Sequence, residues 1–135
     1  MEVVDGDTLA ITSPRGQRQR VRIIGIDTPE SARDGQPAQC WAREATDALR
    51  ELIEQADQVT LAPDSVVGDR DRYGRLLRLV FVDGTDVGEQ LLADGHARRF
   101  AAIADDSRVT DRYRRVERQA RSGGVGLWGR CASSG

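Results

Sequence analysis

The sequence predicts an α+β domain built on a small five-stranded barrel with three helices. Two observations lead to this class. Five short segments are rich in β-branched and other apolar residues and are bounded by turn residues. The helical segments are inserted between these strands or follow them, without the strand–helix–strand alternation of a parallel sheet. A chain of 135 residues can bury one hydrophobic core, so we expect a single domain over residues 1–135.

The first two expected strands are joined by a turn. Residues 3–12 are predicted as a strand that is interrupted at Gly6, and residues 17–26 form the returning strand. Three further strands are expected at residues 58–62, 76–82 and 97–100.

The longest helix is expected over residues 37–56, where Pro37 suits the first turn. Its apolar residues recur with helical spacing on one face, at Trp41, Ala45, Leu49, Leu52 and Ile53.

Two shorter helices complete the predicted fold. Asp86 caps the first of them, which ends before Gly95. The other is capped by Ser107 or Thr110 and runs to Arg121, just before two consecutive glycines.

Composition excludes several classes of function. All 20 basic residues are arginine and the net charge is −2, which does not favour a protein that coats nucleic acid through bulk positive charge. Phosphate binding would depend instead on a few arginines at particular positions in the fold. His96 is the single histidine, so a His–His metal pair is excluded. No apolar run approaches the roughly 20 residues that cross a bilayer.

Cys40 and Cys131 cannot form a zinc site by themselves. We favour a disulfide over two unrelated thiols, because a cysteine in the C-terminal tail has little packing reason to exist. The bond would tie the first helix to that tail. Since disulfides persist in oxidising compartments, we expect a secreted or cell-envelope protein whose export signal lies outside this chain.

Asp5 and Asp7 are two residues apart on a strand and project to the same side. Gly6 between them lets the backbone bend or bulge. The alternative is a turn in which the Asp side chains accept hydrogen bonds from local N–H groups. A calcium loop of the EF-hand type is excluded, because neither Asp is followed by Glu at the twelfth position.

Arg22 lies on the same strand face as Ile24 and Ile26. A guanidinium on an apolar face needs a partner, because an unpaired buried charge is very costly. The alternative is a solvated face that Arg22 shares with Arg18 and Arg20.

The segment Asp27-Thr28-Pro29-Glu30 ends the returning strand. Pro29 removes a backbone donor and favours an extended Thr28, whose carbonyl is then free to coordinate a cation. The alternative is an ordinary capped exit from the strand.

Residues 71–75, Asp-Arg-Tyr-Gly-Arg, form the last of these patterns. Gly74 permits a positive φ that aims Arg75 back towards the other residues, and Tyr73 offers a flat ring and a hydroxyl. A solvated loop is the alternative. The joint occurrence of the four patterns in one small domain is more specific than any one of them.

Together these residues resemble those of the staphylococcal nuclease (thermonuclease) family, from Val3 to Trp128. The similar segments are DGDT, VRIIGIDTPE, DRYGR and the closing GLW. The resemblance implies an OB-fold Greek-key barrel and a Ca²⁺-dependent phosphodiesterase. Such an enzyme cleaves the P–O5′ bond of single-stranded or locally melted DNA and RNA and leaves 3′-phosphates. We expect a monomer.

The resemblance also implies a metal site. Asp7 and Asp27 would bind Ca²⁺ through their carboxylates and Thr28 through its carbonyl. Asp5 would lie next to these ligands without touching the ion.

It further implies catalytic roles. Glu30 would orient or deprotonate the attacking water, Arg22 and Arg75 would grip the scissile phosphate, and Tyr73 would contact the nucleotide.

One position departs from the family pattern. A second nucleotide-contacting tyrosine is replaced by Ala101, so either nucleotide affinity is weaker or Phe100 substitutes for it. A competing hypothesis is a catalytically inactive OB-fold module that binds nucleic acid or protein. Such a module should keep stacking aromatics and lose the carboxylates. This chain is only 4% aromatic and keeps every carboxylate, which favours the nuclease.

Overall fold

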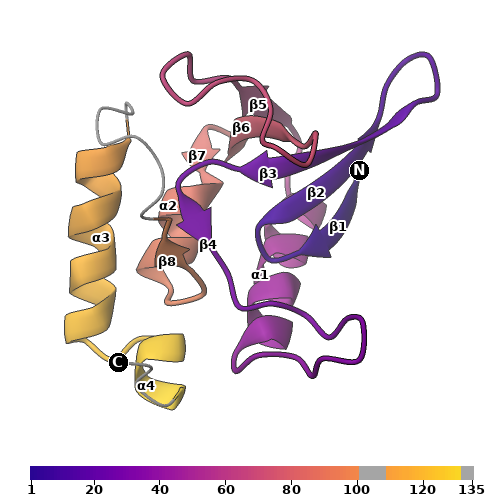
Figure 1. Cartoon of the computed structure of the whole chain (residues 1–135). Coiled ribbons are helices and arrows are strands. Elements are labelled where there is room, and N and C mark those ends of the chain that lie inside the picture. Colours follow the sequence, from indigo (N-terminus) through magenta and orange to yellow (C-terminus); the bar gives the residue numbers. More distant parts are fainter. Residues whose placement is uncertain (101–108, 132–135) are drawn as a thin grey trace.

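A computed structural model describes residues 1–100 and 109–131. A mixed sheet packs against helices on one side (Figure 1). In spatial order the main path of the sheet is β1 (Glu2–Asp5), β2 (Thr8–Thr12), β3 (Arg18–Ile23), β6 (Leu76–Val82) and β5 (Val59–Ala62). The short β7 (Thr85–Asp86) pairs with β6, and β4 (Ile26–Asp27) pairs with β8 (Arg98–Arg99) in a separate two-stranded sheet.

The pairing of β3 with β6 is parallel, whereas β1–β2, β2–β3 and β5–β6 are antiparallel. Val21 lies opposite Leu76, and Arg22 lies opposite Leu77. Arg75 directly precedes β6, so this pairing places it near Arg22 of β3. This sheet has β1 and β5 at its two ends, in keeping with the partly open five-stranded barrel of OB folds.

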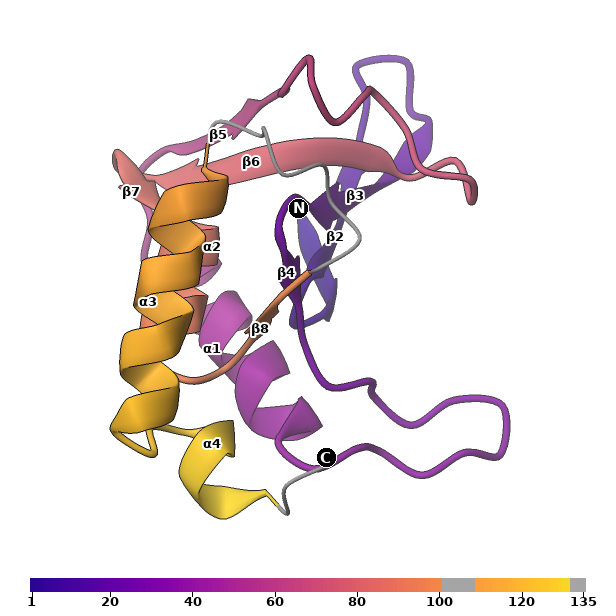
Figure 2. The same ribbon diagram turned by 60° about the vertical axis from the view of Figure 1, so that its left-hand side comes forward.

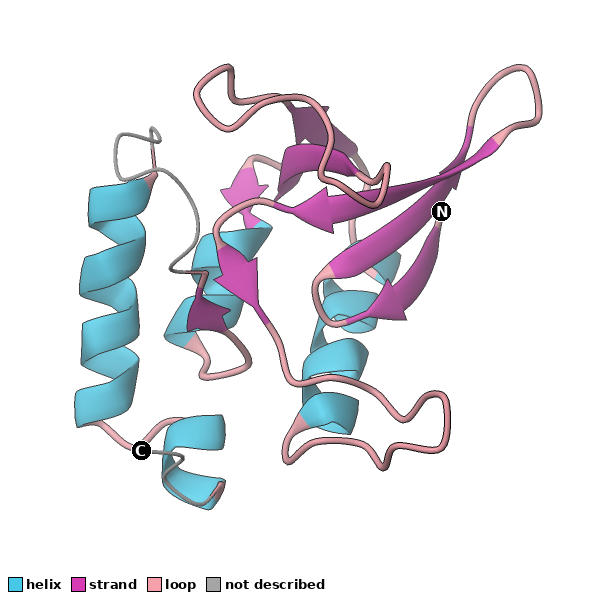
Figure 3. Cartoon of the chain, in the orientation of Figure 1, coloured by secondary structure: helices cyan, strands magenta, loops and turns pink. Residues whose placement is uncertain are grey.

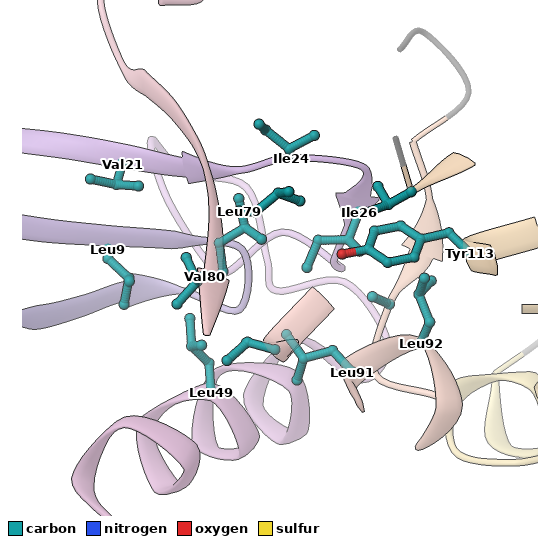
Figure 4. Close-up of a cluster of buried hydrophobic side chains, with 14 of the residues drawn as sticks. Leu9, Val21, Ile24, Ile26, Leu49, Leu79, Val80, Leu91, Leu92 and Tyr113 are labelled. Carbon is teal, nitrogen blue, oxygen red and sulfur yellow. The ribbon is translucent and has the colours of Figure 1, made fainter. Parts of the chain in front are cut away.

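Four helices are described: α1 (Ala42–Glu54), α2 (Val87–Ala93), α3 (Thr110–Ser122) and α4 (Leu127–Arg130). α1 packs against β1, and α3 packs along α2 (Figure 2). One cluster of buried side chains joins the sheet to α1, α2 and α3. In Figure 4 the Tyr113 ring of α3 lies beside Ile26 of β4 and above Leu92 of α2. In the described part of the chain, no helix has both the length and the apolar character needed to cross a membrane.

The predicted α+β class is confirmed, and most elements lie where the sequence predicts them (Figure 3). The Asp86 cap is confirmed, because its carboxylate accepts a hydrogen bond from the Glu89 N–H at 3.1 Å. The predicted Ser107 cap lies outside the described residues. Thr110 is the first residue of α3 rather than its cap, a position that Val109 takes without a side-chain hydrogen bond. The short α4 was not predicted.

Two boundaries differ from the prediction for identifiable reasons. The first helix starts at Ala42 and not at Pro37, because Trp41 has a φ of +76°, which a helix interior does not accept. The strand predicted to reach Ile26 breaks at Gly25, whose φ is +85°. A Cβ at Gly25 would lie 2.8 Å from the Tyr113 ring, so the break lets α3 approach the sheet.

Candidate active site

A pocket of about 1050 Å³ collects nearly all of the predicted site residues. It lies between the β1–β2 turn, β3, the exit from β4 and the loop before β6. The predicted residues that line it are Asp5, Asp7, Arg22, Asp27, Glu30, Tyr73 and Arg75. Thr28 does not line this pocket; it is buried, and its N–H donates to Asp7 Oδ2 at 3.1 Å. Segments separated by more than forty residues of sequence therefore meet at one cavity.

Arg22 is 7% exposed, and its guanidinium has partners on several sides. Nη1 donates to the carbonyls of Ile23 at 2.9 Å and Ile26 at 2.7 Å. Nη2 lies 3.3 Å from Asp7 Oδ2 and 3.4 Å from Asp27 Oδ1. The prediction that a guanidinium here needs a partner is confirmed, and the alternative of a solvated face is wrong for Arg22. Its charge lies between two carboxylates at the floor of the pocket.

The β1–β2 turn holds Asp7 in a fixed position. Besides the Thr28 N–H, the Thr8 hydroxyl donates to Asp7 Oδ1 at 2.9 Å. The register of β1 and β2 shifts between Val3 and Asp5, so the expected irregularity lies just before Gly6. A Cβ at Gly6 would lie 2.8 Å from Thr28 Oγ1, so only glycine allows the turn to pack this closely.

Asp27 is held in a setting that disfavours its charged form. Burial raises the pKa of Asp27 above its usual 3.8, and the Asp7 carboxylate adds to this, although the Arg22 and Arg98 charges lower it. A cation beside Asp7 and Asp27 would favour the ionised carboxylates.

The available ligands suit a hard cation such as Ca²⁺, because they are all oxygens. Within residues 1–100 and 109–131, no group of three or more His, Cys, Asp or Glu side chains is arranged to hold a metal ion. Asp7 and Asp27, with the Thr28 carbonyl, would therefore share a bound ion with water and phosphate oxygens. Thr28 Oγ1 is buried without a hydrogen-bond partner in the structure.

Glu30 has a neighbour that the sequence did not single out. Arg33 Nη2 lies 2.8 Å from Glu30 Oε2 and also 2.8 Å from Asp5 Oδ2. Gln39 holds the backbone of Glu30 by accepting from its N–H at 2.8 Å and donating to its carbonyl at 2.9 Å. Arg33 was missed because it lies in an irregular loop among 20 arginines. The one sequence feature that could have indicated its contact with Glu30 is the spacing of three residues between them.

Asp71 organises the loop before β6. Its Oδ1 accepts the N–H groups of Tyr73 and Arg75, each at 2.9 Å, and its Oδ2 accepts Arg75 Nε at 2.7 Å. Burial alone would raise the pKa of Asp71, but these hydrogen bonds and the Arg75 charge outweigh it and lower the pKa. Gly74 has the predicted positive φ, +80°. The loop thus aims Arg75 into the pocket, as predicted.

Two aromatic rings border the pocket. Tyr73 is 63% exposed, and the guanidinium of Arg75 lies 5.5 Å from its ring centre. Phe100 is 38% exposed and lies 5.3 Å from the Arg22 guanidinium. Ala101, where the family pattern has a tyrosine, lies outside the described residues. Phe100, which directly follows β8, lines the same cavity as Tyr73.

Cys40 and Cys131 form a disulfide in the structure, with their Cα atoms 5.8 Å apart. The bond joins the residue two before α1 to the residue that follows α4. Neither cysteine lines the pocket, so the bond acts on the scaffold.

Comparison with known proteins agrees with this geometry. The model of the family described as "Staphylococcal nuclease homologue" matches residues 20–130. The SPbeta prophage-derived endonuclease YokF of Bacillus subtilis (strain 168) is 36% identical over 126 residues, which is 93% of this chain and 41% of that protein. Endonuclease YncB of the same strain is 34% identical over 126 residues, 93% of this chain and 58% of that protein. A thermonuclease from Staphylococcus hyicus is 33% identical over 129 residues, 95% of this chain and 73% of that protein.

The chain spans about half the length of the two Bacillus relatives. The match to the family model covers most of the chain, and the relatives extend the similarity across nearly all of it. The resemblance carried by the DGDT, DTPE and YGR segments is thereby confirmed: the chain belongs to the staphylococcal nuclease homologue family.

Proposed function

We propose that this chain is a Ca²⁺-dependent nuclease that hydrolyses phosphodiester bonds in DNA and RNA. One observation carries the proposal. Two aspartates, a glutamate and two arginines, drawn from four separate segments, line a single pocket. The relatives described above are named as endonucleases and a thermonuclease, which supports the same activity.

Arg22 and Arg75 would hold the scissile phosphate. A guanidinium can donate two parallel hydrogen bonds to phosphate oxygens and stabilises the charge that grows on them. The carbonyl contacts of Arg22 and the Asp71 contact of Arg75 hold both guanidinium groups at the pocket. A bound Ca²⁺, held by Asp7, Asp27 and the Thr28 carbonyl, would polarise the phosphoryl group.

Glu30 would take a proton from the attacking water as the water oxygen bonds to phosphorus and the P–O5′ bond breaks. The 5′-oxygen would leave as a hydroxyl, with a proton from solvent. The Glu30 carboxylate lines the pocket that Arg22 and Arg75 also line. The cleaved strand then carries a 3′-phosphate, the outcome that the family resemblance implies.

We propose single-stranded or locally melted nucleic acid as the substrate. Tyr73 and Phe100 present exposed rings at the pocket, and bases can stack on such rings only when they are unpaired. We also propose that the chain is a monomeric single domain. We further propose that it belongs to a secreted or cell-envelope protein, which the Cys40–Cys131 disulfide supports.

The test is degradation of denatured DNA and of RNA by the purified protein, with Ca²⁺ or with a Ca²⁺ chelator. Wild type should degrade both only with Ca²⁺, and the products should carry 3′-phosphates. Glu30→Gln should lower kcat by at least about a hundredfold. Glu44→Gln is the matched control, because Glu44 lies exposed on α1 and does not line the pocket. Degradation in the chelator, or a fully active Glu30→Gln, would refute the mechanism. Binding without degradation would favour the inactive module instead.

A further inference from the structure

A second, smaller pocket of about 280 Å³ opens beside the first. Arg20 and Arg70 line both pockets, as do Tyr73 and Arg75, so the two cavities are continuous. The second pocket extends from the site along β3, where Arg18 completes its lining of arginines. It thus lies on a path that a polynucleotide bound at Arg22 and Arg75 would follow.

The two pockets differ in charge. Asp5, Asp7, Asp27, Glu30 and Asp71 line the first, whereas the described lining of the second contains four arginines and no acidic residue. The second pocket therefore suits an anion without the help of a metal ion.

Arg20 carries the charge that is least neutralised there. Its side chain is exposed, and no hydrogen bond or ion pair joins that side chain to any residue that the structure describes. By contrast, Arg18 pairs with Glu2 at 2.9 Å, and Arg75 pairs with Asp71 at 2.7 Å. An exposed arginine with no internal partner on the rim of a basic pocket keeps its donors for a ligand.

Arg70 is aimed into the same pocket but held more firmly. Its Nη1 donates to the Gly74 carbonyl at 2.9 Å, and its only carboxylate neighbour among the described residues, Asp69, is 3.8 Å away. A guanidinium has five N–H donors, so the Gly74 contact fixes its orientation and leaves several donors for an anion.

The spacing along β3 relates Arg20 to the scissile phosphate at Arg22. The two arginines are two residues apart on the strand, so they project from the same face and their Cα atoms are about 6.7 Å apart. That separation is comparable to the distance between neighbouring phosphates in an extended single strand. Tyr73, which lines both pockets, lies where a base between those phosphates can stack.

We propose that Arg20 and Arg70 form a second phosphate subsite, which binds the backbone phosphate next to the one that is cleaved. The inference rests on the proposed function for its substrate class. It makes the chain selective for polynucleotides over dinucleoside monophosphates, because the single phosphate of a dinucleoside monophosphate is the scissile one.

The test uses Arg20→Gln and Arg70→Gln, with Arg43→Gln as the matched control. Arg43 is exposed on α1, has no described ion pair and lines neither pocket. The ratio of kcat/KM for a long single-stranded oligonucleotide to that for a dinucleoside monophosphate should fall about tenfold in either variant. That ratio should not change in the control.

Binding is measured separately, by fluorescence anisotropy of a labelled oligonucleotide with Ca²⁺ chelated. Arg20→Gln should weaken binding about tenfold and reduce the slope of log K against log salt by about 0.7, the contribution of one phosphate on a single strand. Unchanged affinity and slope, or no binding by wild type, would overturn the subsite. If the wild type binds with this arginine dependence but degrades nothing, the subsite stands and the nuclease proposal fails.

Discussion

Arg33 Nη2 lies 2.8 Å from Oε2 of Glu30, the residue to which we assign the attacking water. The same nitrogen contacts Asp5, so one guanidinium joins the end of β1 to the segment after β4 that carries Glu30. Arg33 is a positioning residue in this arrangement, since it acts on the reaction through Glu30.

Arg33→Gln should lower kcat about fivefold, because an exposed ion pair contributes up to about 1 kcal/mol. KM and the thermal midpoint should change little. Steady-state kinetics on denatured DNA measure the effect, and Arg50→Gln, which breaks the exposed pair with Asp47 on α1, is the control. An Arg33→Gln enzyme with wild-type kcat would remove Arg33 from the site.

The two phosphate-binding arginines should differ in their effect on folding. Arg22→Gln and Arg75→Gln should each lower kcat a hundredfold to a thousandfold, roughly the loss seen when an oxyanion donor is removed. Only Arg22→Gln should also reduce the free energy of unfolding, by about 3 kcal/mol, because it leaves the buried Asp7 unpaired. Urea unfolding of both variants distinguishes them; equal stabilities would contradict the assigned burial.

The disulfide should stabilise the fold without taking part in catalysis. Its cysteines are 91 residues apart, and in the chain-entropy model closing such a loop contributes about 4 kcal/mol. A Cys40→Ser, Cys131→Ser double variant should lose up to that amount in urea unfolding and keep wild-type kcat at low temperature. Alkylation of the unfolded, unreduced wild type should give no mass shift; a shift would show free thiols.

Tyr113 should be a structural anchor. Its side chain is 1% exposed, and its hydroxyl lies 2.8 and 2.9 Å from the two carboxylate oxygens of Asp86, the cap of α2. Tyr113→Phe should reduce the free energy of unfolding by about 1–3 kcal/mol, because a buried charged acceptor loses a donor. Tyr73→Phe, at an exposed ring, should leave stability unchanged in the same measurement.

Alkaline pH should reduce the free energy of unfolding through Tyr113. Burial, with Asp86 beside it, raises the pKa of Tyr113 far above its ordinary value of 10. Above about pH 10 the unfolded chain releases this proton and the folded chain keeps it, so stability should fall as pH rises. The decline should be shallower in Tyr113→Phe. Equal slopes of unfolding free energy against pH in the two proteins would contradict this.

The sequence predicted which side chains gather at one pocket better than it predicted the element boundaries. Asp7, Arg22, Asp27 and Arg75 each have a local reason for their position, such as strand alternation or the positive φ of Gly74. Those reasons can be found in a few neighbouring residues, and so the expected cluster of side chains lines one pocket.

Features that depend on distant contacts could not be predicted in this way. Gly25 ends β3 because a ring from α3, almost ninety residues away in sequence, packs against it. Trp41 delays the start of α1 by adopting a positive φ that its residue type does not favour. The contact of Arg33 with Asp5 similarly joins a loop to a turn that no local pattern connects.

The parallel pairing of β3 with β6 has a consequence for the newly made chain. Arg22 and Arg75 are 53 residues apart in sequence and meet only once Val21 lies opposite Leu76. Until that pairing forms, Arg22 and Arg75 are not placed together to bind one phosphate, even where metal ions are present. Under the proposed function, a nascent or unfolded molecule would therefore lack the arginine pair that holds the phosphate, and hydrolysis would begin only when the sheet is complete.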